Sequence, residues 1–302
     1  MAKLLSRRRF SSLLPNHLRL PHVLVLGSAV LGCDGGPERI TGPTTPAEPS
    51  PTDVVRLSRL TTTFHDGRSS LNRYRYDDAG RLARVELEIN FAPGAPLQLT
   101  RYATHEWTGT RLTASDSHAR MSNGQFRHVA HWQYVYDALG YLVRIEREFL
   151  LENGQVGQDT VRFRYDRHGR QAEVRANGEL TIYRYGDDGS LREEEKRFPD
   201  GTVFHVRYEH DRGRNPFYRR VDLVVGTVLA WQSPPLLLSP ANAVREEQRV
   251  GKDPDVVSYV TNEYAYDSGG RPRQNRQSLV NAAHPSTETM VFVMDYEYEP
   301  AT

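Results

Sequence analysis

A strict alternation of apolar and polar side chains recurs along most of the chain and predicts β-strands. It is clearest in "YRYDDAGRLARVELEIN" at 74–90, whose second half has apolar Ala83, Val85, Leu87 and Ile89 on one face and Arg84, Glu86, Glu88 and Asn90 on the other. Successive side chains of a strand point to opposite faces of its sheet. This period of two therefore predicts a sheet with one covered and one solvated face, and it argues against a helix.

The residues between the two alternating stretches have the chemistry of a tight turn. Asp77 suits the first position of a type I turn, where its carboxylate can accept backbone N–H bonds. Gly80 suits the left-handed position that closes such a turn into a strand. Because Tyr74 and Tyr76 share one face of the first strand, the whole phrase predicts a β-hairpin with paired tyrosines beside its turn.

Similar phrases recur from residue 53 onward. Trp107 takes the tyrosine position in a shortened copy, and the copy at 206–218 is degenerate; the repeats lie at 105–112, 134–148, 163–176, 183–198, 206–218, 264–276 and 296–300. Hairpins of this number predict an all-β fold, a repetitive antiparallel meander of roughly a dozen to sixteen strands in a large curved, barrel-like or spiral sheet. Cross-strand packing explains the tyrosines, and an aromatic platform for sugar rings is the alternative.

Composition refines this prediction. The chain has 302 residues, of which 25% are charged and 16 are tyrosines, so its strands supply too few aliphatic side chains for a thick two-layer sandwich. A membrane-spanning barrel needs an outward apolar band flanked by aromatic girdles. The return strands instead carry many charges, which favours a soluble barrel-like or spiral sheet.

The first 32 residues have the organisation of an export signal. Basic Lys3 and Arg7–Arg9 precede an apolar region at 23–32, and "VLGC" at 30–33 resembles the lipobox of bacterial lipoproteins, in which the Cys is lipidated. The alternatives are a membrane anchor or a buried Cys, but about ten apolar residues are too few to span a bilayer. "SRRRF" at 6–10 also resembles the twin-arginine motif, with the general secretory route as the default.

Cys33 is the only cysteine, so no intramolecular disulfide forms and lipidation leaves no free thiol. Residues 1–32 carry five basic and no acidic side chains, so their removal changes the net charge from +1 to about −4. Such a domain has no general attraction to nucleic acid. We therefore predict a signal peptide at 1–32, a lipidated Cys33 with a Pro/Gly/Thr-rich tether at 33–52, and one hairpin-repeat domain at 53–302.

Two groups of motifs resemble known families. "YRYDDAGRL" and "YVYDALGYL" resemble the YD repeat of RHS-type bacterial surface and toxin-shell proteins, whose hairpins coil into a spiralling sheet. The lipobox, polar tether, hairpins, "RNPFY" at 214–218 and "SPANAVREEQ" at 239–248 together resemble bacterial lipoproteins of unknown function described as having a porin-like fold. The resemblance covers most of residues 55–300, implies the fold, and brings no established catalytic residues.

The apolar segment "VVGTVLAWQSPPLLLSP" at 224–240 interrupts the repeats. It predicts a plug or cap at one end of a curled sheet, with Trp231, Leu236, Leu237 and Leu238 as filler. The alternative is an exposed patch that docks a partner.

Chemical motifs are weak. We find no nucleophile elbow, phosphate loop, zinc-protease motif or EF-hand loop, and predict neither enzyme activity, nor a metal, nor a cofactor. His128 and His131, three residues apart, are expected on opposite faces of a strand. The acidic runs at 77–78, 187–188 and 193–195 are explained by turn and strand-face roles.

Two function classes follow for a protein lipid-anchored to a bacterial membrane, periplasmic or surface-exposed. The first is a structural or protein-interaction scaffold of the cell envelope. The second is a module that binds a glycan or small ligand on its concave face. An inward face lined by Tyr, Trp and Arg favours the ligand module, whereas one filled by Val, Leu and Ile favours the scaffold.

Overall fold

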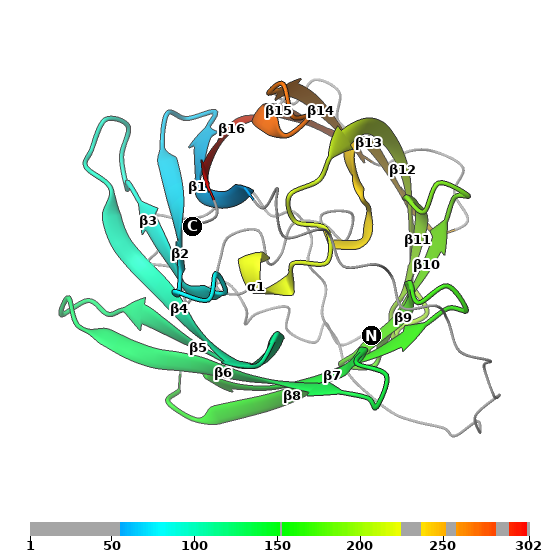
Figure 1. The fold of residues 1–302 in the computed structure, drawn as a ribbon, viewed down its shortest axis with the longest axis horizontal. Helices are drawn as coiled ribbons and strands as arrows, with labels where there is room; N and C mark the ends of the chain where they lie inside the picture. The colour runs from blue at the N-terminus through cyan, green and yellow to red at the C-terminus, as the bar shows by residue number, and fades with distance from the viewer. Residues whose placement is uncertain (1–54, 152, 225–236, 252–257, 282–289, 301–302) are drawn as a thin grey trace, which may run out of the picture.

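The computed structural model describes residues 55–151, 153–224, 237–251, 258–281 and 290–300. These residues form one short helix and sixteen antiparallel strands, which follow one another in chain order around a closed barrel (Figure 1). The strands are β1 (Val55–Phe64), β2 (Ser69–Tyr76), β3 (Leu82–Ile89), β4 (Gln98–Thr108), β5 (Arg111–Arg120), β6 (Phe126–Tyr136), β7 (Leu142–Leu150), β8 (Val156–Tyr165), β9 (Gln171–Ala176), β10 (Glu179–Tyr185), β11 (Leu191–Arg197), β12 (Val203–Arg214), β13 (Ala241–Val250), β14 (Ser258–Tyr266), β15 (Pro272–Asn281) and β16 (Met290–Pro300). The helix α1 (Val221–Val224) lies between β12 and β13.

The predicted all-β hairpin meander is confirmed, and the sheet closes. The first strand pairs with β2 on one side and with β16 on the other, where Leu60 lies opposite Tyr296. The stretch 53–67, which is only weakly repeat-like, thus contains the strand that removes both free edges of the sheet. Closure leaves no exposed edge for pairing with another chain.

The predicted turn chemistry is present in the first hairpin. Gly80 N donates to Asp77 O at 2.8 Å, and Arg81 N donates to Asp77 Oδ1 at 2.8 Å. Gly80 has a φ of 77°, a left-handed conformation that glycine adopts without a Cβ penalty. The turns that begin at Asp137 and Asp166 repeat both hydrogen bonds.

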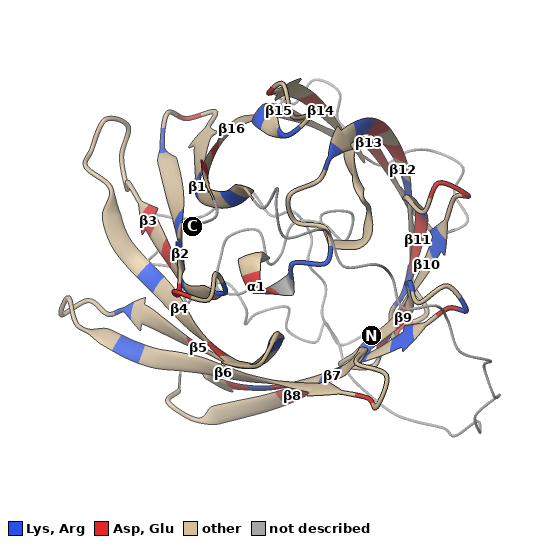
Figure 2. Cartoon of the chain, in the orientation of Figure 1, with Lys and Arg blue, Asp and Glu red and all other residues tan. Residues whose placement is uncertain are grey.

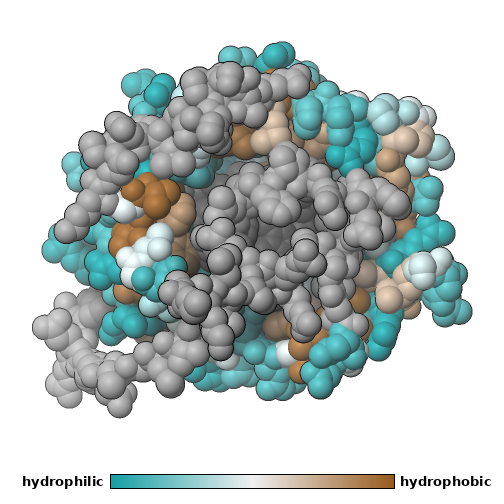
Figure 3. Space-filling view, turned by 180° about the vertical axis from the view of Figure 1, so that it is seen from behind, coloured by the Kyte–Doolittle hydropathy of each residue, from teal (hydrophilic) through white to brown (hydrophobic). Residues whose placement is uncertain are grey.

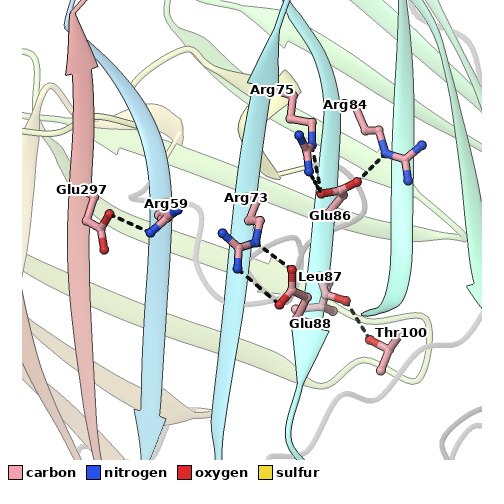
Figure 4. A network of polar contacts seen from close by, with 9 residues as sticks. All are labelled: Arg59, Arg73, Arg75, Arg84, Glu86, Leu87, Glu88, Thr100 and Glu297. Carbon is pink, nitrogen blue, oxygen red and sulfur yellow. Dashed lines mark hydrogen bonds and ion pairs between the residues drawn. The ribbon is translucent and has the colours of Figure 1, made fainter. Parts of the chain in front are cut away.

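The two faces of the wall differ as the alternation predicts. Inward Val85 is 1% exposed and belongs to the largest apolar cluster, which also contains Leu57, Leu60 and Tyr74. On the outer face, Glu86 lies between two arginines, Arg75 and Arg84 (Figure 4). In this hairpin, apolar side chains therefore face the lumen and charged ones face outward.

Charged residues occur on strands all around the barrel (Figure 2), and the visible outer surface is mostly hydrophilic, with hydrophobic residues gathered mainly toward the inside of the ring (Figure 3). This polarity is the reverse of that in a barrel that meets lipid with an apolar outer band. Within the described residues, no helix is long and apolar enough to cross a membrane.

The barrel has two different ends. The turn end contains the turn at 77–81, the start of β1 and the end of β16, because Val55 pairs with Pro300. The opposite, loop end contains the turns at 64–68 and 121–125. The expected hairpin at 206–218 is wrong: β12 continues to Arg214, and the chain then enters an insertion at the turn end before β13 begins.

Candidate functional site: the inner wall of the barrel

The second aromatic residue of most Y-x-Y-D units points inward at the turn end. It donates a hydrogen bond to a backbone carbonyl on the strand that precedes its own in the chain. These pairs are Tyr76 to Leu57 (2.8 Å), Trp107 to Leu82 (2.8 Å), Tyr136 to Leu112 (2.9 Å), Tyr165 to Leu142 (2.7 Å), Tyr185 to Gln171 (2.6 Å) and Tyr298 to Pro272 (3.0 Å). Each bond ties one hairpin to the one before it, which explains why the repeat uses a side chain with both a ring and a donor.

Arginines cover several of these tyrosine rings. The guanidinium carbon lies 5.3 Å from the ring centre for Arg56 over Tyr76, 5.7 Å for Arg111 over Tyr136, 4.8 Å for Arg170 over Tyr185 and 5.4 Å for Arg271 over Tyr298. Such cation–π contacts are favourable. They favour packing between neighbouring hairpins over an open platform for sugar rings.

A plug, residues 215–224 and 237–240, occupies the lumen at the turn end (Figure 1). Asn215 joins its two arms, since its Nδ2 donates to Ser239 O at 2.8 Å and its Oδ1 accepts from Phe217 N at 3.0 Å. Phe217 and Leu223, each 1% exposed, pack with the inward leucines of β1.

The prediction that 224–240 caps the sheet is confirmed where the structure describes it. Leu237 packs against the cluster of Phe217, and Leu238 packs against a second cluster that contains Leu191. The other two predicted filler residues, Trp231 and Leu236, lie outside the described residues.

Two buried polar groups accompany the plug. Asp222 accepts from Arg220 Nε at 3.0 Å and Nη2 at 2.8 Å; burial alone would lower the pKa of Arg220, but these bonds and the negative charge raise it. His105 Nδ1 lies 2.8 Å from Ser115 Oγ. Burial lowers the pKa of His105 to about 4, against the opposing influence of Asp222, so this imidazole is neutral near pH 7.

Charged pairs line the inner wall toward the loop end. Arg147 Nε donates to Asp159 Oδ1 at 3.0 Å, and Lys196 Nζ lies 2.6 Å from Glu179 Oε2. The side chains of Arg147 and Lys196 keep 25% and 30% of their surface exposed although they face inward, so water reaches this part of the wall. Deeper in the wall, burial raises the pKa of Glu194 although its carboxylate accepts a hydrogen bond from Tyr208.

Arg101, which no sequence motif marks, lies on the inner wall. Its strand pairing places Arg101 opposite Leu87, whose side chain faces the lumen. The signal was present, because Arg101 shares its face of β4 with Ala103, His105 and Trp107, the residue in the tyrosine position. A single arginine in an arginine-rich chain does not stand out without that geometry.

The expectation that His128 and His131 lie on opposite faces is wrong. Ser117 pairs with Ala130 and His118 with His128, so Val129 is an extra residue that forms a β-bulge. The bulge brings both imidazoles to the outer face, where His128 Nε2 and His131 Nδ1 each lie 2.9 Å from Asp116 Oδ1. In the described part of the chain, no group of three or more His, Cys, Asp or Glu has the geometry to hold a metal ion.

The acidic runs have the turn and strand-face contacts that the sequence predicts. Asp77 Oδ2 accepts from Arg81, and Asp188 Oδ2 accepts from Arg192 at 2.7 Å. Glu195 on the outer face accepts from Arg197 at 2.6 Å. Cys33, the predicted lipid attachment site, lies outside the described residues.

The fold defines a class, the closed antiparallel barrel with an internal plug. No family model and no curated protein matches the chain. Among solved structures, the chain is similar to a porin-like protein from Bacteroides uniformis, with a TM-score of 0.54 and 14% identity over 86% of this chain and 100% of that one. A porin-like protein from Bacteroides vulgatus matches at a TM-score of 0.39 and 12% identity, over 82% of this chain and 100% of that one, which is too weak to support an argument. At these identities the first likeness supports the fold alone.

Proposed function

We propose that the chain is a cell-envelope protein, anchored through lipid on Cys33, whose barrel serves as a protein-interaction scaffold. The proposal combines the lipobox-like "VLGC" at 30–33 and the polar tether at 33–52 with the topology of the barrel. The similarity of the Bacteroides porin-like structure supports the fold on which the proposal rests, and not the function.

The position of β1 carries the proposal. Val55 lies at the turn end, beside the plug, so the tether joins the barrel at its plugged end. A tether of this composition reaches roughly 50–60 Å when extended. The loop end is therefore the end that the chain presents away from the lipid, and its loops are the surface best placed to meet another envelope protein.

The outer wall suits an aqueous compartment. Ion pairs such as Arg73 with Glu88 at 2.7 Å and Arg59 with Glu297 at 3.4 Å run across neighbouring strands (Figure 4). Exposed pairs of this kind contribute only about 0.2–1 kcal/mol each, so they contribute little to holding the barrel together. They keep the outer wall hydrated and give it a pattern of charge that a partner protein can complement.

The anchoring step is tested by mass spectrometry of the mature chain from a bacterial host. We expect an acylated N-terminal peptide that begins at Cys33, and retention of residues 1–32 in Cys33→Ala. The scaffold step uses a photo-crosslinking residue at Ser122, on an exposed loop-end turn, or at Ala79, on an exposed turn-end turn. A discrete adduct with an envelope protein from position 122 and not 79 supports the proposal; none from either position contradicts it.

A ligand-binding module is the second candidate, and the polar inner wall near the loop end favours it. By the criterion of inward Tyr, Trp and Arg, the described wall is mixed: aliphatic side chains and the plug fill the turn end, while Trp132, Arg101 and Arg147 lie on the remaining inner face. Thermal-shift measurements with glycans and small charged solutes test this candidate, and a flat response throughout would contradict it.

A further inference from the structure

Arg101 is a partly buried charged side chain on the inner wall of β4. Strand pairing places Leu60, Asn72, Leu87 and Arg101 in one inward-facing row across β1 to β4. Among the described strand residues from β16 through β1 to β6, the other inward positions are apolar, aromatic or neutral polar, except Arg127. Arg127 is exposed and lies opposite Ala119, which in turn lies opposite Arg101. The described part of this sector therefore has two inward cations, Arg101 and Arg127, and no inward carboxylate.

The inward cations Arg147 and Lys196 have partners, whereas Arg101 has none among the described residues. Arg147 pairs with Asp159, and Lys196 pairs with Glu179. No hydrogen bond or ion pair joins Arg101 to any residue in the described part of the chain, and burial lowers its pKa. Buried charges in proteins are normally paired, because an unpaired one loses hydration without compensation. An arginine held this way is unfavourable unless something else supplies the negative charge.

Uncharged polar atoms of the same wall also lack partners. Asn72, which lies two strands from Arg101 in the same row, is 1% exposed and its Oδ1 makes no hydrogen bond among the described residues. Adjacent strands are about 4.8 Å apart, so the two Cα atoms are separated by roughly 10 Å, a gap that an arginine side chain can largely cross. The two side chains can thus contact one solute from adjacent positions.

Arg101 is also close to the loop end. It is the fourth residue of β4, which begins at Gln98 at that end, whereas the plug packs at the turn end. A solute approaching through the loop end reaches Arg101 without displacing Phe217 or Leu223. The planar guanidinium offers paired donors that match the oxygens of a carboxylate or phosphate.

We propose that the inner wall near the loop end binds a small solute bearing a carboxylate or phosphate, with Arg101 as its charged anchor and the Asn72 amide as a second polar contact. The proposal rests on the ligand-module candidate and is independent of lipid anchoring and of the scaffold role. It also explains why an unpaired arginine is kept inside the barrel: its partner is the ligand.

The test is a thermal-shift titration of the full-length chain with sodium phosphate, sodium glucuronate or neutral maltotriose at constant ionic strength. The variants are Arg101→Met, Arg101→Lys and the control Arg162→Met, which removes an exposed arginine from the outer face of β8. We expect phosphate or glucuronate at ten times its dissociation constant to raise the wild-type Tm by about 3–6 °C. The shift should persist in Arg162→Met, weaken in Arg101→Lys and vanish in Arg101→Met.

Without added anion, Arg101→Met should have a higher Tm than the wild type, because it removes an unpaired, partly buried charge. A lower Tm, or a chain that does not fold, would overturn the proposal, since Arg101 would then have a structural partner. Equal anion shifts in wild type and Arg101→Met, or a shift with maltotriose alone, would also overturn it while leaving the ligand-module candidate standing. No shift with any of the three solutes would contradict both.

Discussion

Two tyrosines of one strand should respond in opposite directions to loss of their hydroxyl groups. Tyr76 donates to Leu57 O at 2.8 Å, whereas the hydroxyl of Tyr74 is buried and makes no hydrogen bond among the described residues. Both rings face the lumen from β2, so Tyr76→Phe and Tyr74→Phe are matched changes. Tyr74→Phe is therefore a matched control for Tyr76→Phe.

The expected magnitudes follow from the two environments. Removing the Tyr76 hydroxyl loses one buried hydrogen bond and leaves a carbonyl without that donor, which should lower the free energy of unfolding by about 1 kcal/mol. Removing the Tyr74 hydroxyl relieves an unpaired buried polar group, and should raise the free energy of unfolding by about 1 kcal/mol. The two variants should therefore differ by about 2 kcal/mol.

Equilibrium urea unfolding, followed by the fluorescence of the inward Trp107 and Trp132, measures this difference. For a chain of this size, about 2 kcal/mol corresponds to a Tm difference of roughly 4–8 °C, which a thermal melt checks independently. If Tyr74→Phe is as destabilising as Tyr76→Phe, the tyrosines act through ring packing alone, and the hydrogen-bonded link between hairpins is refuted.

Three further predictions concern the turn, the plug and pH. Gly80→Ala forces a Cβ into a left-handed turn beside Arg56, and should destabilise by about 1–3 kcal/mol in urea unfolding; a neutral result would contradict the turn geometry. Phe217→Ala should cost about 3–5 kcal/mol, and a loss below 1 kcal/mol would mean that the plug is not part of the core. The pKa of His105 is about 4 when folded and 6.5 when unfolded, so the unfolded chain binds the proton first as pH falls. Stability from this group is present above pH 6.5 and lost toward pH 4, by on the order of 3 kcal/mol; urea titrations at pH 7 and 5 should show a smaller loss in His105→Gln.

The local parts of the fold were predictable because each hairpin is specified by neighbouring residues. The alternation at 83–90 and the Asp77 and Gly80 turn chemistry fix strand faces within one unit, and both are confirmed. Closure was not predictable, because it depends on Leu60 meeting Tyr296 at the far end of the chain. No local pattern encodes which strand ends the meander, only that an unpaired edge is unfavourable.

The two wrong predictions, the faces of His128 and His131 and the hairpin at 206–218, share one cause. In both places, residues interrupt the two-residue period of the strands. Val129 adds one residue to β6, which brings His131 to the face of His128 and cannot be inferred from spacing alone. The segment at 206–218 has tyrosine and glycine at the positions of a hairpin repeat. Nevertheless β12 continues past the position of the expected turn, and the chain then enters the lumen. Asn215, whose side chain bonds both arms of the plug, marks that departure in the sequence.

The plug also explains how so polar a chain maintains a barrel of this width. A closed sheet of sixteen strands is too wide for its own side chains to fill, as the water-filled channels of large barrels illustrate. Phe217, Leu223 and Leu237 supply apolar surface from within the ring, so inward tyrosines and leucines at the turn end bury against them. The stability contributed by these contacts is concentrated at one end of the lumen, which leaves the inner wall near the loop end free to carry charged and unpaired polar groups such as Arg101.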